Sequence, residues 1–233
     1  MSAPSTPSGA SPPPPAVSPA APGPVAAPAS PLDLGPVLPV AVLDDPADAV
    51  PLARALVAGG LRALEVTLRT AAAPEAVRAV AAEVPEAVVG AGTVLSPAQA
   101  RAAVAAGARF LVSPGWTDRL LEAVRETGVP FLPGVSTASE VLGLLDRGIT
   151  EMKFFPAEAA GGVPWLRALA GPLPGARFCP TGGLTAASAP EYLALGNVGC
   201  VGGGWVVPGD ALAERDWARV ERLAREASRL APG

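Results

Sequence analysis

From about residue 32 onward, short apolar runs alternate with longer amphipathic stretches. The runs are rich in Val, Leu, Phe and Ala, as expected of buried strands in a parallel sheet. The stretches between them carry Arg and Glu at helical spacing, and several begin beside Pro and end at Gly. The pattern predicts strands over residues 37–43, 63–68, 87–92, 110–113, 130–133, 151–155, 177–180 and 198–201. It predicts helices over residues 45–58, 74–83, 97–106, 117–126, 138–146, 164–170, 190–195 and 216–230.

Eight strand–helix units in succession predict an α/β fold, a (β/α)8 TIM barrel, with the active site at the carboxyl ends of the strands. A doubly wound open sheet is the alternative, but no G-x-G-x-x-G follows the first strand. Pro39 lies in the first apolar run. Because Pro cannot donate a hydrogen bond to a neighbouring strand, it favours a later start for that strand.

Residues 1–31 differ from the rest of the chain. They hold 11 of the 29 Pro residues and no charged side chain. Such a composition predicts a disordered low-complexity tail, followed by a barrel domain over residues 32–233. The tail is neither a signal nor a transit peptide, since both need basic residues and the first Arg is Arg54. A start codon assigned too far upstream would explain the same segment.

Composition then limits the chemistry. The 233 residues include 17 Lys and Arg, 21 Asp and Glu, and no His, for a net charge of −4. Without His, the chain can hold no Ser-His-Asp or Cys-His catalytic group and no His-ligated metal. The negative charge argues against nucleic acid as a partner. Outside the tail no run of about 18 strongly apolar residues occurs, so no membrane span is predicted.

Two cysteines, Cys179 and Cys200, each lie in an apolar run. A pair of thiols in a chain large enough to form a core indicates free, buried cysteines in a reducing compartment, hence a cytoplasmic location.

Lys153 is the only Lys among 17 cationic residues. Strand alternation puts Lys153 and Phe155 on the inner face of the barrel and Phe154 on the outer face. Burial favours the neutral amine, which can attack a carbonyl and form a Schiff base, whereas a guanidinium cannot. The alternative is a lysine whose tip reaches solvent at the strand end.

The same alternation turns Glu65, Thr67 and Arg69 toward the barrel interior and its mouth. Glu65 is a candidate general acid/base acting through water, and Arg69 offers two parallel donors to a substrate carboxylate. The alternatives are a structural ion pair of Glu65 with Arg69 or Lys153, and a rim salt bridge for Arg69.

Glycine pairs end two later strands, at Thr181-Gly182-Gly183 and at Gly202-Gly203-Gly204. At this end of a barrel, uncovered backbone N–H groups commonly bind phosphate, although Gly is also an ordinary turn residue. Gly90-Ala91-Gly92-Thr93 ends the third strand. Its small residues would let a ligand approach the barrel floor, with the Thr93 hydroxyl as a donor.

Taken in order, these motifs resemble the 2-keto-3-deoxy-6-phosphogluconate aldolase family, which includes 4-hydroxy-2-oxoglutarate aldolases. The similarity extends from about residue 32 to the carboxyl terminus. It rests on Glu65-Val66-Thr67-Leu68-Arg69-Thr70, Val89-Gly90-Ala91-Gly92-Thr93-Val94, Ser113-Pro114-Gly115, Lys153-Phe154-Phe155-Pro156-Ala157-Glu158 and Cys179-Pro180-Thr181-Gly182-Gly183.

The resemblance implies a class I aldolase, a lyase of Entner–Doudoroff-type sugar acid catabolism that needs no metal or cofactor and forms a homotrimer. Lys153 would be the Schiff-base lysine and Glu65 the general acid/base. The substrate would be 2-keto-3-deoxy-6-phosphogluconate, cleaved to pyruvate and glyceraldehyde 3-phosphate. The residues implied in substrate binding are Arg69 and Thr93 for the pyruvyl carboxylate, Pro114 and Phe155 for pocket shape, Thr181 for the hydroxyl end, and Gly182, Gly183, Gly203 and Gly204 for the phosphate.

The sequence departs from the family at Gly204, where many relatives carry Ser after the two Gly of the last strand. A hydroxyl donor to the phosphate would be missing, which bears on substrate preference and not on the aldol chemistry. 4-Hydroxy-2-oxoglutarate and the galactonate epimer are alternative substrates within the same chemistry. A phosphosugar isomerase or epimerase, and a non-enzymatic scaffold or ligand-binding barrel, are alternatives outside it.

Overall fold

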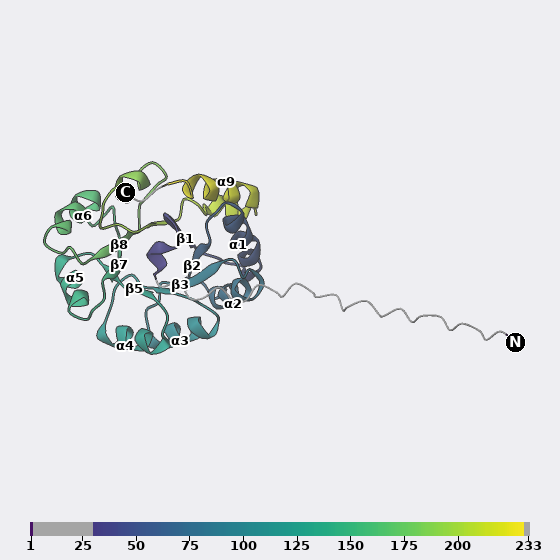
Figure 1. Cartoon of the computed structure of the whole chain (residues 1–233), viewed down its shortest axis with the longest axis horizontal. Helices are drawn as coiled ribbons and strands as arrows, with labels where there is room; N and C mark the ends of the chain where they lie inside the picture. Colours follow the sequence, from purple (N-terminus) through teal and green to yellow (C-terminus); the bar gives the residue numbers. More distant parts are fainter. Residues whose placement is uncertain (2–29, 231–233) are drawn as a thin grey trace.

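Parallel strands lie at the centre of the computed structural model, and helices surround them (Figure 1). The structure describes Met1 and residues 30–230. Apart from Met1, Ser30 and Pro31, the predicted disordered tail, 1–31, lies outside the described residues. The strands are β1 (Val37–Ala41), β2 (Ala63–Thr67), β3 (Val88–Gly92), β4 (Leu111–Val112), β5 (Phe131–Leu132), β6 (Gly134–Val135), β7 (Glu151–Phe154), β8 (Arg177–Pro180) and β9 (Val201–Gly203).

All strand pairs are parallel, in a six-stranded sheet of order β5-β4-β3-β2-β1-β9 and a three-stranded sheet of order β6-β7-β8. Isolated bridges, Phe178 to Val198 and Thr181 to Gly202, link the second sheet to the first. The predicted parallel α/β class is confirmed. The strands form two sheets, however, instead of the one continuous eight-stranded ring that was predicted.

Three strand predictions need correction. The fifth predicted strand, 130–133, holds only β5, and the sequence did not predict β6, which follows it. Pro133, which has no N–H to donate, separates the two strands. The eighth, 198–201, begins later, at Val201, because the N–H of Val198 bonds the carbonyl of Leu195 in a turn. Pro39 does not delay the first strand, since β1 starts at Val37 and Pro39 lies in register with Gly203.

The helices follow the amphipathic pattern. Thr117 and Thr137 cap two of them with side-chain oxygens, Thr137 in a capping box with Glu140. The sequence did not predict α8, which follows Pro208 in the loop after β9. The helices are η1 (Pro31–Asp33), η2 (Pro46–Asp48), α1 (Ala49–Ala58), α2 (Ala73–Glu83), α3 (Pro97–Ala105), α4 (Asp118–Thr127), α5 (Ala138–Leu145), α6 (Gly162–Ala170), α7 (Ala189–Leu193), α8 (Gly209–Ala213) and α9 (Trp217–Ala227).

Two apolar clusters form the core. The larger lies between the strands and the helices, and the smaller fills the space between the strands. The smaller cluster consists of Leu32, Leu38, Ala63, Val88, Phe110, Val112, Leu132, Cys179 and Cys200. In β2 and at the end of β8, apolar Ala63 and Cys179 of this cluster precede polar Glu65 and Thr181 on the same face, so there the space between the strands becomes polar toward the carboxyl ends.

The amino end of the described chain packs against the amino ends of β7 and β8, which we call the foot of the strands. Leu32 is 2% exposed and lies against the backbone of Gly199. The Ser30 hydroxyl donates to Glu151 Oε2 at 2.6 Å, and Arg177 bonds both Glu151 and Asp33 at 2.9 Å. Ser30 is therefore part of the folded unit, at the start of β7 and β8.

This contact predicts a sharp limit to truncation. Deleting residues 2–29 should leave Tm within about 2 °C, because none of the foot contacts is lost. Deleting residues 2–33 removes the buried Leu32 and the Arg177–Asp33 pair, and should lower Tm by roughly 5–15 °C in scanning calorimetry. Leu32→Ala in the full chain is the matched control. An equal loss of Tm in both deletions would contradict the assignment.

Candidate active site

Lys153 and Glu65 meet in the space between the strands. Lys153 comes from β7 and Glu65 from β2, and Lys153 Nζ lies 3.5 Å from Glu65 Oε1. Their side chains are 4% and 1% exposed, so the predicted facing pair is confirmed, and the alternative of a Lys153 tip in solvent is wrong. Oε1 of Glu65 makes no hydrogen bond within the described chain. One carboxylate lone pair thus remains available to a water or a reacting group.

The aromatic neighbours of Lys153 divide as the strand alternation predicts. The Phe155 ring lies over the amine, with its centroid 5.0 Å from Nζ, a cation–π distance. Phe154 points to the helix layer and stacks on Trp165 of α6, with ring centroids 4.2 Å apart. The amine therefore lies between the Glu65 carboxylate and the face of the Phe155 ring.

Two glycines of β3 serve packing, not ligand access. A Cβ on Gly92 would lie 1.9 Å from Glu65 Oε1, and one on Gly90 would lie 2.3 Å from the Phe110 ring. The prediction that these small residues open the floor to a ligand is therefore wrong. Instead, Gly92 provides the space that the Glu65 carboxylate occupies beside Lys153.

Arg69 and Thr93 lie together at the carboxyl ends of β2 and β3. Arg69 Nε donates to Thr93 Oγ1 at 3.2 Å. Among the described residues Arg69 forms no ion pair, so the rim salt bridge considered as an alternative is not found there. Thr93 has φ +57°, a left-handed conformation uncommon for a residue with a side chain. Such local strain is typical of functional sites, and here it presents an exposed guanidinium next to a hydroxyl.

Pro114 lies at the end of β4, half-buried. A Cβ on Gly134 would come within 2.2 Å of the Pro114 carbonyl, so the backbones of the two loops are in direct contact. The Ser113 hydroxyl donates to the carbonyl of Gly115 at 2.6 Å and fixes this turn.

A cavity of about 470 Å³ opens at the carboxyl ends of β1, β2, β7, β8 and β9. Among the described residues, Arg69 is the only charged side chain that lines it; Lys153, Glu65, Thr93 and Pro114 lie outside the lining. It is bounded by Val40, Val42, Arg69, Phe155, Thr181, Gly182, Gly183, Leu184, Gly202, Gly204, Trp205, Val207, Gly209 and Leu212.

The turn after β8 exposes donors to this cavity. Gly182 and Gly183 have φ +104° and +82°, conformations that favour Gly, and their N–H groups have no hydrogen-bond partner within the described chain. Thr181, 8% exposed, packs its hydroxyl over Gly202, where a Cβ would lie 2.1 Å away. These unpaired amides form the kind of concave backbone site that takes up an anion.

Gly203 and Gly204, the predicted phosphate-binding glycines at the end of the last strand, differ in their access to the cavity. Gly204 lines the cavity, and a Cβ there would meet no atom within 4 Å. Gly203 does not line it, because the Trp205 ring covers this glycine: a Cβ on Gly203 would lie 2.5 Å from the ring. Trp205 was not among the predicted site residues, although its place directly after the Gly run is a usable signal.

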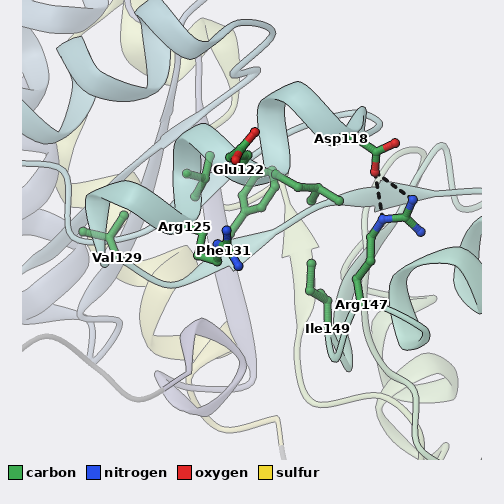
Figure 2. Close-up of a pocket in the computed structure, with 9 residues that line it drawn as sticks. Asp118, Glu122, Arg125, Val129, Phe131, Arg147 and Ile149 are labelled. Atoms are coloured by element: carbon green, nitrogen blue, oxygen red, sulfur yellow. Dashed lines mark hydrogen bonds and ion pairs between the residues drawn. The ribbon is translucent and has the colours of Figure 1, made fainter.

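A second hollow, of about 440 Å³, lies on the outer surface beside α4 (Figure 2). It is framed by the Arg147–Asp118 ion pair at 2.7 Å, with Phe131 and Ile149 at its base. It contains none of the predicted site residues and no nucleophile, so it does not compete as the reaction site.

The cysteines and the acidic side chains offer no second reactive or metal-binding site among the described residues. Cys179 and Cys200 are free and buried, as predicted. Hydrogen bonding of the protonated Cys200 thiol with Cys179, reinforced by burial, holds the pKa of Cys200 well above its usual value, so this thiol does not act as a thiolate. Within the described part of the chain, no group of three or more Cys, Asp or Glu residues is arranged to hold a metal ion. No helix there is long and apolar enough to cross a membrane.

Comparison with known proteins bears on this geometry. The sequence profile described as "KDPG and KHG aldolase" matches residues 29–223. The chain is 56% identical over 196 residues to the KHG/KDPG aldolase of Escherichia coli (strain K12), covering 84% of this chain and 92% of that protein. A KDPG aldolase structure from Legionella pneumophila, with pyruvate captured as a covalent carbinolamine, superposes with TM-score 0.83 and 46% identity, covering 84% of this chain and 96% of the other. The Zymomonas mobilis ZM4 enzyme with 3-phosphoglycerate gives TM-score 0.83 and 49% identity, covering 87% and 95%.

Proposed function

Because the chain belongs to the KDPG and KHG aldolase family, we propose that it is a class I aldolase that cleaves 2-keto-3-deoxy-6-phosphogluconate to pyruvate and glyceraldehyde 3-phosphate. The observation that carries this proposal is the single Lys of the chain, buried 3.5 Å from a buried Glu. Borohydride reduction in the presence of pyruvate, followed by peptide mapping, should find a covalent adduct on Lys153.

In the reaction, the neutral amine of Lys153 attacks the C2 ketone and forms a carbinolamine. Loss of water gives a protonated imine, which serves as the electron sink. The C4 hydroxyl loses its proton as the C3–C4 bond breaks, the bond electrons form an enamine, and the aldehyde leaves. Protonation of C3 and hydrolysis of the imine release pyruvate and restore the amine. The carbinolamine of pyruvate in the Legionella enzyme supports this course.

Glu65 is the proposed general acid/base. Its Oε1 makes no hydrogen bond in the described chain, and it lies beside the amine at which imine formation takes place. Through a water, this carboxylate can accept the C4 proton and return one to C3. The mechanism needs no metal and no cofactor.

The remaining site residues would bind the substrate ends. Arg69 and Thr93, joined at 3.2 Å, would hold the pyruvyl carboxylate, since a guanidinium and a hydroxyl together match its two oxygens. Phe155 over the amine and Pro114 at the end of β4 would shape the pocket around C2 and C3. Thr181 would contact the hydroxyl end of the substrate.

The phosphate would bind at the far end of the cavity. The free amides of Gly182 and Gly183 favour this, as does the cavity lining at Gly204. Gly203, covered by Trp205, would contribute through its backbone only. The Zymomonas enzyme with 3-phosphoglycerate shows that a relative takes up a phosphorylated acid.

Gly204→Ser should strengthen phosphate binding. The space around Gly204 is open, so the new hydroxyl fits without clash and adds one donor. We expect KM for the phosphorylated substrate to fall about 3- to 10-fold, with KM for 4-hydroxy-2-oxoglutarate unchanged. Steady-state kinetics on both substrates measures this, and Gly204→Ala is the control for bulk without a donor. An equal effect of Ala and Ser would argue against a phosphate contact.

4-Hydroxy-2-oxoglutarate is a proposed second substrate, in keeping with the printed name of the E. coli relative. The galactonate epimer remains an alternative at C4, where the ratio of kcat/KM for the two epimers decides. A phosphosugar isomerase, epimerase or mere scaffold is not favoured, because relatives at 46–56% identity are named aldolases.

We also propose that the two sheets form one (β/α)8 barrel over residues 32–233, preceded by the predicted tail. The bridges Phe178 to Val198 and Thr181 to Gly202 support closure, and so does the single residue, Pro133, that parts β5 from β6. A homotrimer is proposed from the family resemblance; light scattering should give three times the 23.1 kDa chain mass. The free thiols and the sugar-acid substrate favour a cytoplasmic location.

A further inference from the structure

Glu158 and Tyr192 make a polar contact that the proposed reaction does not use. Tyr192 lies on α7 and is 2% exposed. Its hydroxyl donates a hydrogen bond to Oε1 of Glu158 at 2.9 Å. Burial, reinforced by this bond, raises the pKa of Tyr192, so the phenol remains a protonated donor at physiological pH.

The backbone around Glu158 is bonded to the turn after β8. The N–H of Ala157 donates to the carbonyl of Thr181 at 2.8 Å, and the N–H of Glu158 donates to the carbonyl of Gly182 at 3.1 Å. These bonds occupy the carbonyl groups of the turn on the β7 side. The amides of Gly182 and Gly183 have no partner within the described chain, so they remain available to a ligand.

The side chain of Glu158 lies directly against this turn. A Cβ on Gly183 would be 2.7 Å from Cγ and 2.8 Å from Cβ of Glu158. Gly183 thus packs on the apolar stem of Glu158, while the carboxylate of the same side chain is bonded to Tyr192. Displacement of the stem would displace the turn.

We infer that Tyr192 is a positioning residue for the phosphate-binding turn: it fixes the Glu158 carboxylate, and the Glu158 stem in turn supports Gly183. The bond also keeps a negative carboxylate from rotating toward the phosphate, where like charges repel. This inference rests on the proposed function. It assigns Tyr192 and Glu158 to the recognition of phosphorylated substrates and leaves the Schiff-base chemistry to Lys153.

Tyr192→Phe keeps the buried ring and removes the hydroxyl. We expect KM for 2-keto-3-deoxy-6-phosphogluconate to rise about tenfold and the inhibition constant of inorganic phosphate to rise in parallel. KM for the unphosphorylated 4-hydroxy-2-oxoglutarate, and kcat for both substrates, should stay within about twofold. A merely structural role would shift both substrates alike, and that result, or no shift at all, would overturn the inference.

Two further variants keep the test independent of folding in the core. Glu158→Ala removes the same bond from the more exposed partner and should reproduce the rise in KM for the phosphorylated substrate alone. Glu158→Gln retains an oxygen that accepts from Tyr192, and should restore KM to within about threefold of wild type. If the wild-type protein forms no borohydride-trapped pyruvate adduct, the proposed function fails and this inference with it. If the adduct forms and Glu158→Ala leaves both KM values unchanged, the inference alone is wrong.

Discussion

Lys153→Arg is expected to abolish the borohydride-trapped pyruvate adduct and to lower kcat at least about 10³-fold. The guanidinium stays protonated and cannot form an imine, yet it keeps a positive charge beside Glu65. Intact-mass analysis after reduction with pyruvate measures the adduct, and a coupled pyruvate assay measures kcat. Full aldolase activity in this variant would remove Lys153 from the mechanism.

Lys153→Met is the companion variant, and it separates chemistry from stability. It also removes the nucleophile, but it leaves the Glu65 carboxylate buried without its ion-pair partner. Breaking a buried pair in this way costs about 3–5 kcal/mol, so Lys153→Met should unfold at a lower temperature than Lys153→Arg while being equally inactive. The Tm of each variant, measured by calorimetry, checks this ordering.

Glu65→Gln is expected to lower kcat for cleavage about 10²- to 10⁴-fold while pyruvate can still be trapped on Lys153. Gln has the shape of Glu, so it fits the space that Gly92 leaves, but it cannot accept a proton. The measurement is kcat together with the rate of adduct formation. The outcome against a proton-transfer role would be a kcat within twofold of wild type.

Gly92→Ala tests the position of the Glu65 carboxylate, whereas Glu65→Gln tests its ability to accept a proton. The added methyl group would collide with Glu65 Oε1, so the carboxylate must leave its place beside Lys153. Loss of kcat in both Glu65→Gln and Gly92→Ala would show that the carboxylate must be both present and correctly placed.

The sequence was sufficient to predict which side chains point into the space between the strands. A strand alternates its side chains with a period of two, so Lys153, Phe154 and Phe155 could be assigned to faces from β7 alone. The meeting of Lys153 with Glu65, 88 positions apart in sequence, followed from the expected barrel. A single lysine among arginines indicated the candidate nucleophile.

Contacts between elements could not be predicted in the same way. A glycine leaves space, but the sequence does not say what fills it: Phe110 fills the space at Gly90 and Trp205 the space at Gly203. Tyr192 lies in the predicted helix 190–195, but its contact with Glu158 depends on how α7 lies against the turn after β7. The late start of β9 depends on a turn bond of Val198, which the apolar run conceals.

The foot of the strands has a practical consequence. Ser30 bonds Glu151 at the start of β7, whereas the cavity opens at the opposite, carboxyl ends of the strands. An affinity tag, a fused enzyme or a linker to a solid support that is joined directly at Ser30 would therefore be attached on the side away from the cavity. Immobilised through this end, the aldolase would keep its mouth toward the solution.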